Sequence, residues 1–201
     1  MSMIKHELAV LFLVLLAGCS GRPARYEAPS VDLDAAAAKA IELYDTNADD
    51  SLSKEELAKC PGILAKLTAY DSDGNGSIGQ SEIATHLGRL LNRTGGTQLS
   101  ALIFLKGRPL GGATVIMEPE PYLGEGIQSA KGVTDGSGST ELAISPEFVP
   151  EHLRRINTVH YGTFKVRVTH PSVKIPAKYN TETELGYETE PGMPSVRFDL
   201  K

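Results

Sequence analysis

The stretch DSDGNGSIGQSE, residues 71–82, carries an acidic or amide side chain at positions 1, 3 and 5 and ends on a glutamate. Calcium binds about six to eight oxygen atoms, and a twelve-residue loop supplies them from positions 1, 3, 5, 7, 9 and 12. Position 6 turns sharply, which favours the glycine found there, Gly76. Gly79 at position 9 has no side chain, so we expect a water at that vertex. The predicted metal ligands are Asp71, Asp73, Asn75, Ser77 through its carbonyl, and Glu82.

A second stretch, DTNADDSLSKEE at residues 45–56, repeats this spacing. Its predicted ligands are Asp45, Asn47, Asp49, Ser51, Ser53 and Glu56. Leu52 and Ile78 occupy position 8 of the two loops, where an aliphatic residue is expected to join them through a short β-bridge. Position 6 of this loop is Asp50, and a left-handed backbone costs a non-glycine residue about 1–2 kcal/mol. We therefore expect two Ca²⁺ sites, of which the 71–82 loop binds more tightly.

The sequence around both loops has a helical pattern, with Ala37, Ile41 and Tyr44 on one face before the first loop. Residues 33–91 resemble an EF-hand pair, which implies calcium binding by the two loops. Four short helices are expected, with Pro61-Gly62 interrupting the connection. Because the helices between the loops are so short, the helix-swinging motion of a calcium sensor is not expected.

The second half of the chain reads as β-structure. Seven β-type runs separated by turns predict a β-sandwich over residues 99–201, with one helical interruption near SPEFVPEHLRR. The turn positions and strand order resemble a bacterial transthyretin-like domain of the carboxypeptidase regulatory-like kind, which implies a non-catalytic structural or binding module. The expected fold class is α+β multidomain: a small all-α EF-hand pair followed by an all-β transthyretin-like, immunoglobulin-like sandwich.

The N-terminal residues indicate export. An apolar run of about ten residues is too short to span a bilayer and fits a signal peptide. It ends in Leu16-Ala17-Gly18-Cys19, which resembles the lipobox of bacterial lipoproteins and implies lipid attachment at Cys19. The next residue is serine, so the outer membrane is the favoured location if the cell has two membranes. The expected organisation is a signal peptide at 1–18, a tether at 19–31, the EF-hand pair at 32–92, a linker at 93–98 and the sandwich at 99–201.

These features predict a calcium-binding, membrane-anchored lipoprotein that acts as a non-enzymatic envelope or surface module. A net charge of −5 argues against nucleic acid as a partner, and no small-molecule substrate is indicated. Two alternatives stay open: a calcium-dependent sensor or adaptor for an envelope protein, and an enzyme sited on the sandwich. His160, Tyr161, His170 and Tyr179 invite comparison with the iron ligands of intradiol dioxygenases, although their local sequence does not match that family. Cys60, left unpaired, is expected in the core.

Overall fold

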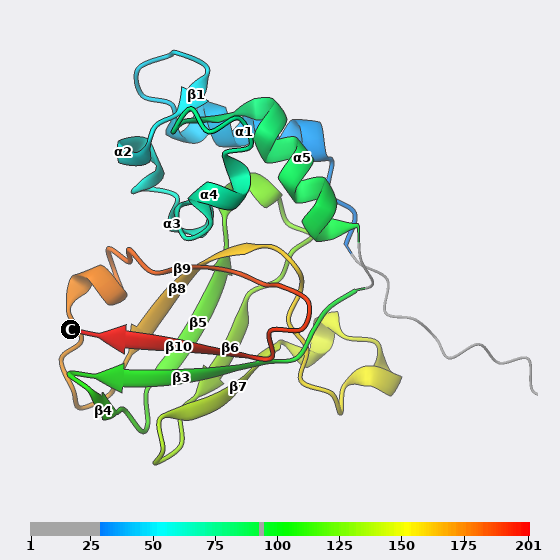
Figure 1. Ribbon diagram of the computed structural model, residues 1–201. Helices are drawn as coiled ribbons and strands as arrows, with labels where there is room; N and C mark the ends of the chain where they lie inside the picture. The colour runs from blue at the N-terminus through cyan, green and yellow to red at the C-terminus, as the bar shows by residue number, and fades with distance from the viewer. Residues whose placement is uncertain (1–28, 93–94) are drawn as a thin grey trace, which may run out of the picture.

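The computed structural model describes residues 29–92 and 95–201 (Figure 1). A helical part, residues 29–92, covers one side of a sheet part, residues 95–201. The predicted signal peptide and Cys19 lie outside the described residues.

Two longer helices frame the helical part. Helix α1 (Leu33–Tyr44) starts at Asp32, whose side chain accepts a hydrogen bond from the Ala35 backbone N–H. Helix α5 (Gln80–Leu91) packs against it. The buried faces of the two helices consist of Ala36, Ala37, Ala40 and Tyr44 on α1 and Ile83, Leu87 and Leu90 on α5. Small alanine side chains on one helix and larger aliphatic ones on the other allow the two helices to approach closely.

Three one-turn helices lie between the loops: α2 (Lys54–Leu57), α3 (Pro61–Leu64) and α4 (Leu67–Tyr70). The helical part thus has five helices where the sequence predicted four. Pro61 begins α3 rather than lying between helices, because the first helical position needs no backbone N–H. Helix α2 still ends before Pro61, where Cys60 is not helical, and a second break at Lys66 separates α3 from α4. Cys60 is a free, fully buried thiol beside Pro61, and its predicted place in the core is confirmed.

All seven predicted β-runs form strands, and a short eighth strand joins them. The sheet part contains β3 (Leu99–Leu105), β4 (Arg108–Pro109), β5 (Thr114–Pro119), β6 (Ala130–Val133), β7 (Ser139–Ile144), β8 (Thr163–Thr169), β9 (Gly186–Glu188) and β10 (Ser195–Leu200). The strand order is β10-β3-β7-β6-β5-β8-β9, with β4 paired to β3. Neighbours are antiparallel except β10 and β3, which are parallel.

Strand β7 gives this sheet its sandwich-like shape. Its first four residues, 139–142, pair with β3, whereas Ala143 and Ile144 pair with β6. A strand that changes partners in this way joins two layers into one curled sheet (Figure 1). The predicted β-rich second half is therefore confirmed. The predicted helical interruption is present as two 3₁₀ turns, Pro146–Phe148 and Glu151–Leu153.

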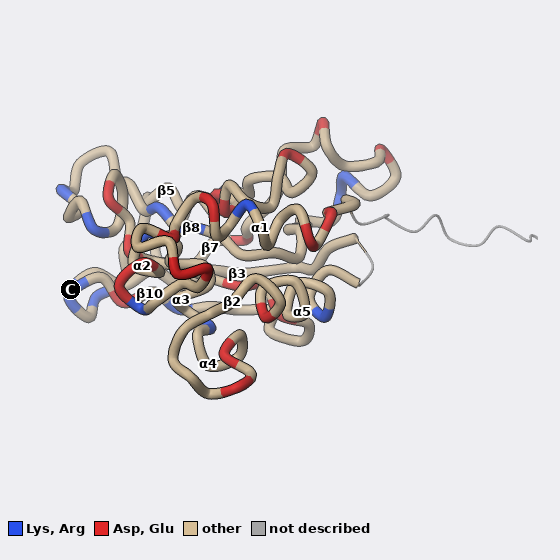
Figure 2. Tube along the Cα trace, turned by 90° about the horizontal axis from the view of Figure 1, so that it is seen from above, with Lys and Arg blue, Asp and Glu red and all other residues tan. Residues whose placement is uncertain are grey.

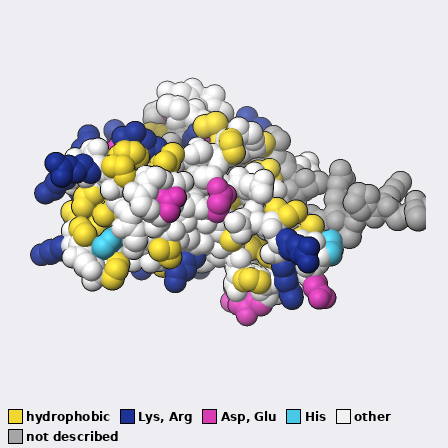
Figure 3. Space-filling view, turned by 90° about the horizontal axis from the view of Figure 1, so that it is seen from below, with side chains coloured by type: hydrophobic (Ala, Val, Ile, Leu, Met, Phe, Trp, Pro, Cys, Tyr) yellow, Lys and Arg dark blue, Asp and Glu magenta, His cyan; other side chains and the backbone are white. Residues whose placement is uncertain are grey.

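The helical part and the sheet part share one continuous hydrophobic core. Helix α3 lies directly against β8 and β9. Gly186 in β9 sits so close to the Pro61 carbonyl that no Cβ would fit between them. Several of the acidic residues lie along the trace at α2, α4 and the adjoining loops (Figure 2). On the face seen from below, hydrophobic side chains form small separate groups and acidic ones are sparse (Figure 3). The loops of the helical part are thus one region in which acidic residues gather.

Candidate metal centre

The two acidic loops lie side by side. We call residues 45–56 the first loop and residues 71–82 the second loop. Each contains a two-residue strand, β1 (Ser51–Leu52) and β2 (Ile78–Gly79), and these strands pair antiparallel with Leu52 opposite Ile78. Both side chains are fully buried, so the expected bridge between the position-8 residues is present.

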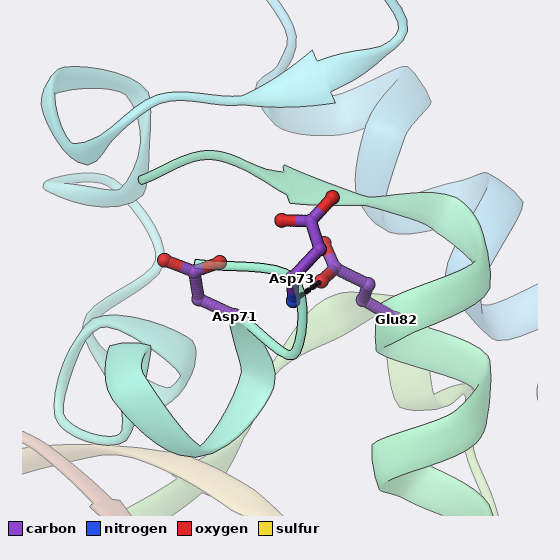
Figure 4. A group of neighbouring side chains, drawn as sticks. All are labelled: Asp71, Asp73 and Glu82. Atoms are coloured by element: carbon purple, nitrogen blue, oxygen red, sulfur yellow. Dashed lines mark hydrogen bonds between the residues drawn. The ribbon is translucent and has the colours of Figure 1, made fainter. Parts of the chain in front are cut away.

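The second loop brings three carboxylates together. Asp71 and Asp73 stand at the start of the loop and Glu82 approaches from the first turn of α5 (Figure 4). One oxygen atom from each of the three lies within 4.8 Å of the others. In residues 29–92 and 95–201, no other group of three histidine, cysteine or acidic side chains meets this condition. Three converging carboxylate oxygens form a donor set suited to a hard divalent cation.

Glu82 closes the second loop by accepting hydrogen bonds at both of its oxygens. Its Oε1 accepts from the Ser72 backbone N–H at 2.8 Å and from the Ser72 hydroxyl at 2.9 Å. Its Oε2 accepts from the Gly79 backbone N–H at 2.9 Å. Burial works against ionisation, but the hydrogen bonds, led by Gly79, outweigh it and lower the pKa of Glu82. The carboxylate is therefore held in its charged form, the form that binds metal.

Glu56 closes the first loop in the same way. Its Oε1 accepts from the backbone N–H and the hydroxyl of Thr46, at 2.7 and 2.9 Å. Its Oε2 accepts from the backbone N–H and the hydroxyl of Ser53, at 2.9 and 2.7 Å. These bonds, led by that of the Ser53 hydroxyl, lower the pKa of Glu56 to about 2. The Ser53 hydroxyl, a predicted position-9 ligand, is thus engaged by Glu56.

The other predicted ligands line the two loops and bond mainly within them. Asp45 accepts from the backbone N–H groups of Ala48 and Asp50, and Asp71 accepts from those of Gly74, Asn75 and Gly76. Further contacts join Asn47 with Asp49, Asp49 with Ser51, Asn75 with Asp73, and Ser77 with Asn75. Each loop is therefore wound around its own polar side chains. Among the predicted carboxylate ligands, Asp49 and Asp73 are exposed, Asp45, Asp71 and Glu82 are partly buried, and Glu56 is buried.

Backbone geometry separates the two loops. Gly74 and Gly76, at positions 4 and 6 of the second loop, have φ values of 74° and 86°. Ala48 and Asp50, at the same positions of the first loop, have φ values of 60° and 63°. The left-handed backbone predicted for Asp50 is confirmed, and Ala48 adds a second strained position that the sequence reasoning missed. The clue was available, since the second loop has glycine at both positions.

Two further features were not anticipated. Thr46 and Ser72, at position 2 of the loops, both donate to the terminal glutamate through backbone and hydroxyl; the repeated hydroxyl residue was a usable signal. The tyrosines before the loops, Tyr44 and Tyr70, donate to buried glutamates of the sheet part, and no sequence pattern marked those glutamates.

The histidines considered for iron make separate contacts with the backbone. His160 Nδ1 accepts a hydrogen bond from the Gln128 backbone N–H at 3.0 Å, and burial lowers its pKa to about 4. His170 Nε2 lies 2.9 Å from the Gly111 carbonyl, and its Nδ1 accepts from the Ser172 and Val173 backbone. Both rings thus have structural hydrogen bonds to separate stretches of backbone.

No family model, curated protein or solved structure matches this chain. None of the helices within residues 29–92 and 95–201 has both the length and the apolar character needed to cross a membrane.

Proposed function

We propose that the helical part is an EF-hand pair that binds Ca²⁺ in both loops. The observation that carries the proposal is the convergence of Asp71, Asp73 and Glu82 beside a second loop of the same design. The ligand set is oxygen alone, as a hard cation requires. Asp71, Asp73, Asn75, Ser77 and Glu82 would hold one ion, and Asp45, Asn47, Asp49, Ser51, Ser53 and Glu56 the other.

Calorimetric titration of calcium into the chelator-treated full chain tests this proposal. We expect two sites with dissociation constants in the micromolar-to-millimolar band. The matched control is the double variant Glu56→Gln/Glu82→Gln, which keeps the side-chain shapes and removes both terminal carboxylates. Absence of saturable heat in the unaltered chain, or equal uptake by the double variant, would refute calcium binding by these loops.

The protein's role in this proposal is that of a non-enzymatic envelope or surface module whose fold is stabilised by calcium. Packing of α3 on β8 and β9 supports a static role rather than that of a sensor, because helices held against a sheet are not free to swing. We further propose a transthyretin-like fold for the sheet part, on the strength of its strand order and curled shape.

We also propose that the chain is exported and anchored to a membrane by lipid on Cys19. The apolar run and the Leu-Ala-Gly-Cys sequence before the tether support this part of the proposal. Replacing Cys19 with serine should leave an unprocessed, unlipidated precursor, because the thiol that carries the lipid is gone. Normal processing and unchanged partition into detergent by the Cys19→Ser protein would show that the anchor is misassigned.

A further inference from the structure

Two glutamates of the sheet part are buried beneath the helical part. Glu120 directly follows β5 and is fully buried, and Glu188 ends β9 with 3% of its surface exposed. A carboxylate removed from water is costly unless its oxygens accept hydrogen bonds. The donors to these two carboxylates come mainly from the helical part, at positions that flank the two loops.

Glu120 holds the chain on both sides of the first loop. The hydroxyl of Tyr44, the residue before the loop, donates to its Oε2 at 3.0 Å. The backbone N–H of Gly62 donates to its Oε1 at 2.9 Å, and Gly62 lies in α3, the helix after α2. Lys165 from β8 adds a positive charge 3.6 Å from Oε2. One buried carboxylate therefore joins the residue before the first loop to α3, the second helix beyond the start of that loop.

Glu188 does the same for the second loop. The hydroxyl of Tyr70, the residue before this loop, donates to its Oε2 at 3.0 Å. His86, one turn along α5 from Glu82, places its Nε2 3.0 Å from both Glu188 oxygens. The Tyr70 and His86 rings stack with centroids 3.8 Å apart, and His86 Nδ1 lies 3.1 Å from the Ala69 carbonyl. The helices that enter and leave the second loop are thus joined at this carboxylate.

The two arrangements are similar, although Glu120 contacts α3 and Glu188 contacts α5, the helix that directly follows its loop. Each loop is preceded by a tyrosine whose hydroxyl reaches a buried glutamate, and each glutamate also holds a residue beyond the loop. A metal loop must bring its position-12 carboxylate to the ligands at positions 1, 3 and 5. Fixing its two ends in advance removes part of the ordering cost of binding and raises the fraction of molecules ready to bind.

We propose that Glu120 and Glu188 are positioning residues that raise the calcium affinity of the first and the second loop, respectively. This inference rests on the proposed calcium binding and adds that the sheet part sets the affinity of each loop separately. It also gives a physical reason for the expectation that the helices do not swing. Helix α5 cannot turn away from α4 without separating His86 and Tyr70 from Glu188.

The test uses the full chain in two single-site backgrounds. In the Glu56→Gln background only the second loop keeps its terminal glutamate. In the Glu82→Gln background only the first loop keeps it. Into each background we would introduce Tyr44→Phe or Tyr70→Phe, which remove only the hydroxyl that donates to the buried glutamate. Tyr179→Phe is the matched control, because Tyr179 is also buried and its hydroxyl accepts from the Lys201 backbone instead.

We expect Tyr70→Phe to weaken calcium binding by the second loop about tenfold, which corresponds to roughly 1.4 kcal/mol. The same variant should weaken calcium binding by the first loop less than about twofold. Tyr44→Phe should show the opposite selectivity, and Tyr179→Phe should change neither loop. Glu188→Gln and Glu120→Gln should repeat the selectivity of their tyrosine partners. Combining Glu188→Gln with Tyr70→Phe should weaken binding by less than the sum of the two separate effects, because both changes act on the Tyr70–Glu188 hydrogen bond.

Selectivity separates a positioning role from a merely structural one. Equal weakening of both loops by each variant, or a lower melting temperature with unchanged affinities, would overturn the inference while leaving calcium binding intact. If the unaltered chain takes up no calcium at all, the proposed function fails and this inference fails with it. The two failures are therefore distinguished by the first titration.

Discussion

The first and second loops share one design but differ in how easily the backbone adopts it. Both place a hydroxyl residue at position 2, a buried aliphatic at position 8 and a multiply hydrogen-bonded glutamate at position 12. The second loop has glycine at both left-handed positions, whereas the first has Ala48 and Asp50. In the second loop three carboxylates also converge. The comparison shows that two loops with the same ligand spacing can differ in backbone strain and in carboxylate geometry.

The largest expected effect comes from removing the position-12 carboxylates one at a time. Glu82→Gln should abolish the tighter calorimetric step and Glu56→Gln the weaker one. Each loss should be at least about 100-fold, the upper end of what altering a metal site's supporting partners costs. If Glu56→Gln removes the tighter step instead, the ranking by backbone strain is wrong and the Ser53 hydroxyl at position 9 matters more.

Substitutions at the residues with a left-handed backbone test whether backbone strain makes the first loop bind calcium more weakly than the second. Gly76→Ala should weaken the second loop about fivefold to thirtyfold, the effect of about 1–2 kcal/mol of left-handed strain. No atom lies within 4 Å of the added Cβ, so a steric clash would not explain the loss. The pair Ala48→Gly/Asp50→Gly should tighten the first loop by at least that factor, because it relieves two left-handed positions.

The strain lowers affinity only if it is relieved when the loop opens without metal. Melting temperatures measured with and without calcium show whether the strain is relieved in the metal-free loop. Gly136→Ala is the control, because Gly136 lies in a turn, has room for a Cβ and does not have a positive φ. Altered melting temperatures with unchanged calcium affinities would mean that the strain persists in the metal-free loop.

The smallest effect concerns the proton affinity of the two terminal glutamates. The Ser53 hydroxyl is the leading cause that lowers the pKa of Glu56 to about 2, and Gly79 offers the second loop no such group. Ser53→Ala should therefore raise the pKa of Glu56 in calcium-free protein, as followed by NMR titration of the carboxyl carbons. Ser51→Ala is the control, since the Ser51 hydroxyl donates to Asp49 instead.

The sign of the linked stability follows from the depressed pKa. Glu56 binds a proton more weakly in the folded chain than its ordinary value of 4.5 implies. Its hydrogen bonds thus contribute stability above about pH 4.5, and this contribution is lost as the pH falls toward 2. Ser53→Ala should flatten the stability curve in that window. An unchanged curve and an unchanged Glu56 pKa would contradict the assigned role of the hydroxyl.

Sequence reasoning did best where the relevant interactions are local. The strands of the sheet part follow runs of β-type residues between turns, and all seven expected runs are strands. Leu52 and Ile78 pair as their position in the loops suggested. It did less well around Pro61, where the same residue can stop one helix or start another. Helix α3 packs against β9, a contact that no local pattern records.

The ligand spacing of both loops could be read from the chain alone, because every ligand of a loop lies within twelve residues of the others. The burial of Glu120 and Glu188 could not be predicted from the chain alone. Tyr44 and Glu120 are 76 residues apart, and Tyr70 and Glu188 are 118 apart. A glutamate near the end of a strand is ordinarily solvated, and only the folding of the helical part onto the sheet part buries these two. Once they are buried, their need for hydrogen-bond donors is what connects the sheet to the flanks of both loops.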